Sequence, residues 1–218
     1  MLKRLLFSFF FIILYCISNA QTKSLEYEFK GGVNLNSSYG NRGTSMSVGY
    51  NAEGYIKPRV GKHFSIKTGL QYEQNGWAYR SLILESNITS GSSTSDIIYK
   101  LNYLNLPILG EYSIGRRVKF YADGGVFIGA LLNSVILEKQ KQAASNQVNI
   151  IKSSSDYYRR INFGVSIGVG TRIPLASKVN LVFDVKNNLG LTNIAKTTSN
   201  STMKTNTISI SSGLAFFL

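Results

Sequence analysis

Two adjacent runs of alternating residues, joined by a polar turn at Gly115–Arg117, place the strongest constraint on the fold of this chain. Residues two apart lie on the same face of a β-strand, so alternation separates the side chains of each run into two faces. In the second run one face is uncharged and mostly apolar: Val118, Phe120, Ala122, Gly124, Val126, Ile128, Ala130 and Leu132. The opposite face includes Lys119 and Asp123. The segment 101–133 therefore predicts a β-hairpin with one apolar face, which must contact either a protein core or lipid.

The same alternation recurs along the chain and predicts eight strands, at residues 26–37, 46–57, 64–75, 101–112, 118–133, 160–173, 179–189 and 207–218. The connections alternate in length. Short turns are expected near 58–62, 113–117 and 174–178, and long loops near 38–45, 81–96, 134–158 and 191–206. An even number of strands, with short turns at one rim and long loops at the other, is typical of an outer-membrane barrel. The predicted fold is an all-β, eight-stranded, antiparallel, up-and-down transmembrane β-barrel.

The polar face of these strands carries acidic and basic residues in nearly equal number. It predicts a charge network in the barrel lumen, formed by Glu28, Lys30, Glu53, Lys67, Glu73, Glu111, Lys119, Asp123, Arg160, Arg172, Asp184 and Lys186. Lys57 lies on the same face. A soluble barrel of lipocalin type is the alternative, and it would reverse the two faces. Trp77 and Tyr79, at the end of the third strand, are expected in an aromatic belt at the membrane interface.

The first twenty residues have the pattern of a cleaved secretory signal peptide. Lys3 and Arg4 precede an apolar run from Leu5 to Ile17, and the segment ends in Ser18–Ala20. We expect residues 1–20 to be removed and residues 21–218 to form the barrel domain. The single cysteine, Cys16, lies in the predicted signal peptide, so the mature chain has neither disulfides nor thiolate chemistry. The formal charge of +13 favours anionic lipid head groups over nucleic acid as a partner, because only 16% of residues are charged.

Several short motifs resemble those of the bacterial outer-membrane β-barrel protein family, in its porin-like, PorT-like branch. They are Gly31–Asn34, Leu70–Gly76, Tyr103–Leu109, Gly124–Gly129, Leu189–Ile194 and Gly213–Phe217. Together they extend over nearly the whole mature chain. The resemblance implies an eight-stranded barrel that the outer-membrane assembly machinery inserts, with no catalytic residues assigned.

Residues capable of catalysis or metal binding are scarce. The only histidine, His63, is expected beside the short turn 58–62. A barrel hydrolase would place its histidine base at the other rim, beside the long loops. One histidine and no mature cysteine leave no zinc site. Gly164, Gly168 and Gly170 miss the spacing of a phosphate-binding loop. We interpret them instead as lumen glycines that leave room for Tyr121 and Phe127.

We therefore predict a small bacterial outer-membrane protein that is not an enzyme and has no cofactor. Its role would be structural or partner-binding, and an eight-stranded barrel is too narrow for a general diffusion pore once side chains fill it. An accessory barrel of a secretion or assembly apparatus is the sharper alternative. The expected partners are outer-membrane lipids and a protein bound through the long loops, with the barrel itself monomeric. The basic turn residues Arg59, Lys62, Arg116 and Arg117 either contact inner-leaflet head groups or are solvated.

Overall fold

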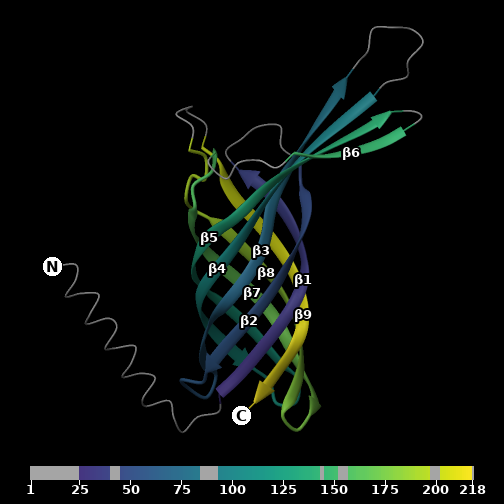
Figure 1. The fold of residues 1–218 in the computed structure, drawn as a ribbon. Helices are drawn as coiled ribbons and strands as arrows, with labels where there is room; N and C mark the ends of the chain where they lie inside the picture. Colours follow the sequence, from purple (N-terminus) through teal and green to yellow (C-terminus); the bar gives the residue numbers. More distant parts are fainter. Residues whose placement is uncertain are drawn as a thin grey trace, which may run out of the picture.

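The computed structural model describes residues 25–39, 45–83, 93–142, 145–151, 157–196 and 202–217, and the predicted signal peptide lies outside them. These residues form one antiparallel sheet that closes on itself (Figure 1). Its strands are β1 Leu25–Tyr39, β2 Ser47–Pro58, β3 Phe64–Ile83, β4 Ser93–Ile114, β5 Lys119–Gln142, β6 Ser145–Ile151, β7 Ile161–Ala176, β8 Val179–Gly190 and β9 Lys204–Phe217. None of the described residues forms a helix long and apolar enough to cross a membrane.

Eight of these strands form the barrel, as the alternation predicted. Neighbouring strands pair in the order β4-β3-β2-β1-β9-β8-β7-β5, and the β4–β5 pairing closes the ring. The first and last strands pair along nearly their full length, from Glu26↔Phe217 to Tyr39↔Lys204. Closure leaves no open sheet edge in the barrel wall. This matters because lipid cannot form hydrogen bonds with the backbone groups of an open edge.

The connections at one rim are short, as predicted, and lie near residues 59–63, 115–118 and 177–178. Gly115 adopts a φ of 112°, a left-handed conformation that favours glycine, and a Cβ here would lie 2.1 Å from the Val118 carbonyl oxygen. Both the start of β1 and the end of β9 lie at this rim (Figure 1).

At the opposite rim the predicted loops are partly wrong, because the strands continue beyond the barrel. The pairing of β3 with β4 runs on to Ile83↔Ser93, within the predicted loop 81–96. Likewise β5 continues to Gln142 and pairs with β6, which lies within the predicted loop 134–158. The outer parts of β3, β4, β5 and β6 form a sheet that leaves the barrel at this rim (Figure 1), which we call the extension.

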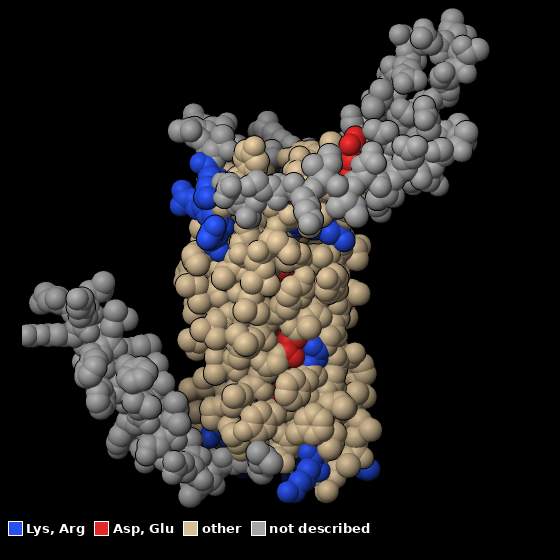
Figure 2. Space-filling model, viewed as in Figure 1, with Lys and Arg blue, Asp and Glu red and all other residues tan. Residues whose placement is uncertain are grey.

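The apolar parity of the barrel strands faces outward. Ile167 and Val169 of β7 are 66% and 59% exposed, whereas Ser166 and Gly168, which alternate with them, are buried. Charged side chains gather at the two ends of the cylinder and are sparse on the wall between them (Figure 2). An apolar belt with an interior of charged and polar groups is the arrangement of a barrel in lipid.

Candidate functional site

The lumen is filled by three successive zones of side chains, which can be followed along β3. Near the short-turn rim the inward residue is Lys67, then come Gln71, Glu73 and Asn75, and Trp77 follows toward the extension. All five side chains are buried. The interior thus changes from charged, to amide and hydroxyl, to aromatic along the barrel axis.

Arg172 of β7 is the centre of the charged zone. Its guanidinium contacts Glu28 at 2.9 Å, Glu111 at 2.6 Å and Glu26 at 3.0 Å. The same group lies over the Tyr121 ring, 3.9 Å from the ring centroid. An arginine fork suits several carboxylates at once, because its donors point in fixed, separate directions. Arg172 therefore joins carboxylates from β1 and β4 to β7 across the lumen.

The lysines extend this network to the other strands. Lys30 contacts Glu28, Glu53 and Asp184, and Lys67 bridges Glu28 at 3.0 Å and Asp123 at 3.1 Å. The buried network contains Glu26, Glu28, Lys30, Glu53, Lys57, Lys67, Glu111, Asp123, Arg172, Asp184 and Lys186. Every one of these charges has at least one opposite charge within 4 Å, which is what makes burial in a lumen tolerable.

Three residues of the predicted network do not take part in its ion pairs. Arg160 is exposed and its assignment to the lumen is wrong, because the residue precedes β7, where the parity no longer fixes the direction of its side chain. Lys119 is half-exposed at the short-turn rim, 6.0 Å from the Phe217 ring centroid. Glu73 is buried as predicted but accepts hydrogen bonds from the amides of Gln71, Asn105 and Asn188 instead of a cation.

Two groups of the charged zone, Glu26 and Tyr55, were not predicted from the sequence. Glu26 contacts Lys57 at 2.7 Å, and its parity with Glu28 was the signal that could have placed it inside. Tyr55 is 1% exposed, and its hydroxyl accepts a hydrogen bond from Lys186 at 2.8 Å. The Lys67 Nζ lies 4.5 Å from the Tyr55 ring centroid, a cation–π distance. Alternation also predicts Tyr55 inside, between Glu53 and Lys57.

The middle zone is uncharged except for Glu73, and it consists of amides and hydroxyls that bond to one another. Asn51 donates to Asn34 at 2.6 Å and accepts from Ser211 at 3.0 Å, and Ser166 donates to Asn188 at 2.7 Å. Such side chains satisfy each other without counterions. This layer separates the charged zone from the extension side of the lumen.

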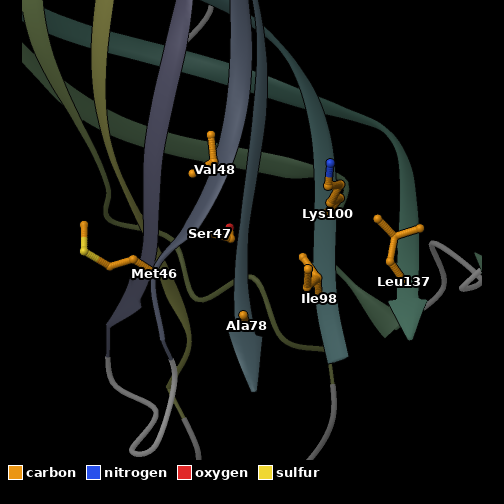
Figure 3. Close-up of a pocket in the computed structure, with 7 residues that line it drawn as sticks. All are labelled: Met46, Ser47, Val48, Ala78, Ile98, Lys100 and Leu137. Atoms are coloured by element: carbon orange, nitrogen blue, oxygen red, sulfur yellow. The ribbon is translucent and has the colours of Figure 1, made fainter. Parts of the chain in front are cut away.

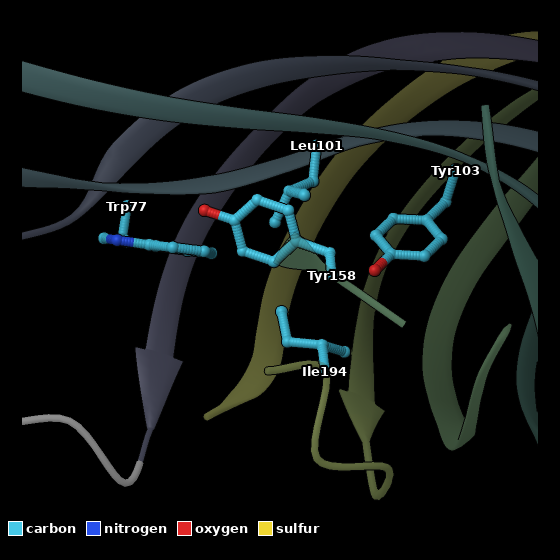
Figure 4. Close-up of a cluster of buried hydrophobic side chains, with 5 residues drawn as sticks. All are labelled: Trp77, Leu101, Tyr103, Tyr158 and Ile194. Carbon is cyan, nitrogen blue, oxygen red and sulfur yellow. The ribbon is translucent and has the colours of Figure 1, made fainter. Parts of the chain in front are cut away.

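An aromatic and aliphatic cluster fills the lumen at the extension side and is here called the cap: Trp77, Leu101, Tyr103, Tyr158 and Ile194 (Figure 4). Trp77 stacks on Tyr99 at a centroid distance of 5.3 Å and meets Tyr158 edge-on at 6.1 Å. The predicted place of Trp77 in a lipid-facing belt is wrong, because its side chain is 1% exposed and shares the inward parity of Glu73. Burial raises the pKa of Tyr158 to about 12, so its phenol stays neutral.

The lumen glycines make room for large neighbours, as the sequence predicted. A Cβ at Gly164 would lie 2.5 Å from Phe127 Cζ, and one at Gly170 would lie 2.4 Å from Tyr121 Cζ. Real carbon contacts are longer, so even a methyl group would force the ring or the strand to move. At Gly124, which faces outward, the nearest atom to such a Cβ is the Ser166 carbonyl oxygen at 3.7 Å.

We therefore expect Gly164→Ala and Gly170→Ala to lower the free energy of unfolding by about 1–3 kcal/mol each. The matched control Gly124→Ala should lie within about 0.5 kcal/mol of the parent protein, as is usual for surface substitutions. The measurement is urea unfolding of the protein in lipid vesicles, followed by the fluorescence of the single tryptophan. Equal destabilisation by all three changes would contradict the packing described here.

His63 is exposed at the short-turn rim, where its Nδ1 lies 2.9 Å from the Ser113 carbonyl oxygen. The extension and the cap are at the other end of the barrel. Among the described residues, no group of three or more His, Cys, Asp or Glu side chains is arranged to hold a metal ion. The buried carboxylates are held by lysine, arginine and amide groups of the chain itself.

Comparison with known families agrees with this geometry. The model of the outer membrane protein beta-barrel domain family matches residues 19–196. The chain belongs to this family. It lies in the bacterial outer membrane, and the alternative of a soluble lipocalin-like barrel is wrong, because the apolar parity faces outward and the charged parity faces the lumen. No curated protein matches the sequence.

Solved structures of small outer-membrane barrels resemble the family member described here in fold. Neisserial surface protein A (NspA) superimposes with a TM-score of 0.49 at 12% identity, over 88% of this chain and 96% of that one. The outer membrane protein OprG from Pseudomonas aeruginosa gives a TM-score of 0.44 at 11% identity, over 88% and 95% of the two chains. Ail, the attachment invasion locus protein of Yersinia pestis, gives a TM-score of 0.38 at 14% identity, over 88% of this chain and 98% of that one.

Proposed function

We propose that this protein is a closed, non-catalytic barrel that holds the extension outside the membrane as a binding surface for a protein partner. The observation that carries the proposal is the filled lumen. The charge network, the amide layer and the cap occupy successive levels of the interior, while the wall continues beyond the cap as the extension. A barrel filled in this way is an anchor rather than a general pore.

The extension has the geometry of a surface that can pair with another chain. Among the described residues, β6 pairs with β5 and with no other strand. Within the described part of the chain, one edge of β6 therefore has no strand beside it. A free edge can accept an extended segment of a partner as an additional strand, with backbone hydrogen bonds supplying the affinity.

Two measurements test the proposal. The purified protein in a planar lipid bilayer should give no stepwise conductance, and reproducible steps would contradict a closed lumen. For the partner, a photo-reactive amino acid at Gln147 of β6 should give a discrete adduct on intact cells. The same probe at the lipid-facing residue Ile167 should give none.

The extension can be removed without touching the barrel, which makes the second test sharper. Tyr79 pairs with Ile97 and Leu137 pairs with Ile150, so an Asn-Gly turn between each pair would close two short hairpins. The trimmed chain should still shift in gel mobility on boiling, as a folded barrel does, and should lose every phenotype that depends on the partner. If the trimmed chain supports every function of the parent protein, the extension is not the binding surface.

The PorT-like resemblance gives a more specific form of this proposal, in which the partner is a component of a secretion or assembly apparatus. The position of β6 at the end of the sheet favours a protein partner of some kind and does not identify it. Mass spectrometry of the Gln147 adduct would distinguish the two forms, because it names the protein that is bound.

A further inference from the structure

The barrel wall has a step between β2 and β3 on the side nearest the extension. The pairing of β2 with β3 covers Asn51–Ile56 of β2, but β2 itself begins at Ser47. Gln74–Trp77 of β3 are all buried in succession instead of alternating. Asn36 donates from the lumen to the Gln74 carbonyl oxygen at 2.9 Å, which gives that oxygen a side-chain partner. The two backbones pair again at Ser45 and Ala78, so the step is an interruption of the ladder between these pairings.

The step leaves a groove of about 290 Å³ in the wall. It is lined by Met46, Ser47, Val48, Ala78, Ile98, Lys100 and Leu137. Figure 3 shows Met46 and Val48 on one side of the groove and Ile98, Lys100 and Leu137 on the other. Met46 and Val48 are 59% and 64% exposed, so their side chains face out of the barrel. The groove is therefore open to whatever surrounds the wall.

The depth of the groove places it at the outer membrane interface. Val48 lies about ten residues from the short-turn end of β2, and a strand that rises about 3.3 Å per residue at a tilt of about 40° climbs about 25 Å over that length. The apolar band of a bacterial barrel is itself about 25 Å tall. The groove therefore begins where the acyl chains of the outer leaflet meet their head groups. Among the described residues that line it, Lys100 is the one with a charge.

We propose that this groove binds a phosphorylated glycolipid of the outer leaflet, with an acyl chain against Val48 and Ile98 and a head-group phosphate on Lys100. The apolar lining fits a hydrocarbon chain, and none of the described residues that line the groove is acidic and would repel a phosphate. Lipid also surrounds this face of the barrel. The site is distinct from the β6 edge of the extension, so lipid binding can fail while partner binding persists.

The experiment measures binding of diphosphoryl lipid A to the full mature chain in detergent, by native mass spectrometry. Val48→Trp should fill the groove and weaken binding about tenfold, the loss of roughly two buried methylene groups. Lys100→Gln should weaken it about fivefold, as expected for one lysine at an anionic interface. Ile167→Trp on the plain wall and Arg117→Gln at the other rim are matched controls and should bind as the parent protein does.

Fully dephosphorylated lipid A separates the head group from the acyl chain. It should bind the parent protein about fivefold more weakly, and Lys100→Gln should cause no further loss with this lipid. Gel mobility before and after boiling shows that each variant is folded. Unchanged binding by Val48→Trp, or equal affinity for the two lipids, would overturn the proposal, as would a protein dimer that Val48→Trp disrupts.

Discussion

Replacing Arg172 by methionine should lower the free energy of unfolding by about 3–5 kcal/mol, the largest electrostatic effect we expect in this protein. The guanidinium is the shared partner of Glu26, Glu28 and Glu111, and its side chain is 2% exposed. Methionine keeps much of the volume but leaves these carboxylates without their common cation. Urea unfolding in lipid vesicles, followed by tryptophan fluorescence, measures the loss.

Two further variants show that the effect belongs to the buried network. Arg160→Met removes an exposed arginine near the opposite end of the same strand and should change stability by less than about 0.5 kcal/mol. Adding Glu111→Gln to Arg172→Met should recover part of the loss, because one of the unpaired carboxylates disappears. Additive losses in the double variant would show that Glu111 and Arg172 are not coupled.

Replacing Trp77 by alanine should cost about 3–5 kcal/mol of stability, because the cap loses its largest side chain. The indole packs within the cap and stacks on Tyr99 (Figure 4). Circular dichroism and gel mobility against urea concentration can follow this variant, which has no tryptophan.

The conservative change Trp77→Phe is the control, since a smaller ring keeps part of the contact with Tyr99 and Tyr158. We expect it to cost less than half of the alanine effect. A lipid-facing tryptophan would behave differently, because alanine at the membrane interface leaves no cavity in the lumen. Similar, small losses for both variants would return Trp77 to the aromatic belt that its position at the end of the third predicted strand had suggested.

The alternation of apolar and polar residues predicted the barrel well. Each strand of the barrel contacts lipid on one face and a charged lumen on the other, so successive side chains must alternate in polarity. This pattern correctly placed Lys67, Asp123 and Arg172 inside, and it related Gly164 and Gly170 to the bulk of Phe127 and Tyr121. It failed where strand boundaries mattered. Arg160 precedes its strand, so its parity carried no information about direction.

Two other features could not be read from the sequence for physical reasons. Residues 134–142 and 145–151 are polar enough to resemble a loop, yet they pair as strands because neighbouring strands supply hydrogen-bond partners outside the membrane. The partners within the network depend on the stagger of strands around the closed barrel. Glu28 and Arg172 are 144 residues apart in sequence, and no local pattern brings them together.

The long sequence separation of the charge pairs has a consequence for how the protein enters the membrane. Glu28 and Lys30 belong to the first strand, but Arg172 and Asp184 follow only near the end of the chain. A partly inserted chain would hold these early charges in a nonpolar medium without the counterions that β7 and β8 supply, at a large cost. Insertion and closure must therefore be nearly concerted. Intermediates with only the first strands in the bilayer should not accumulate.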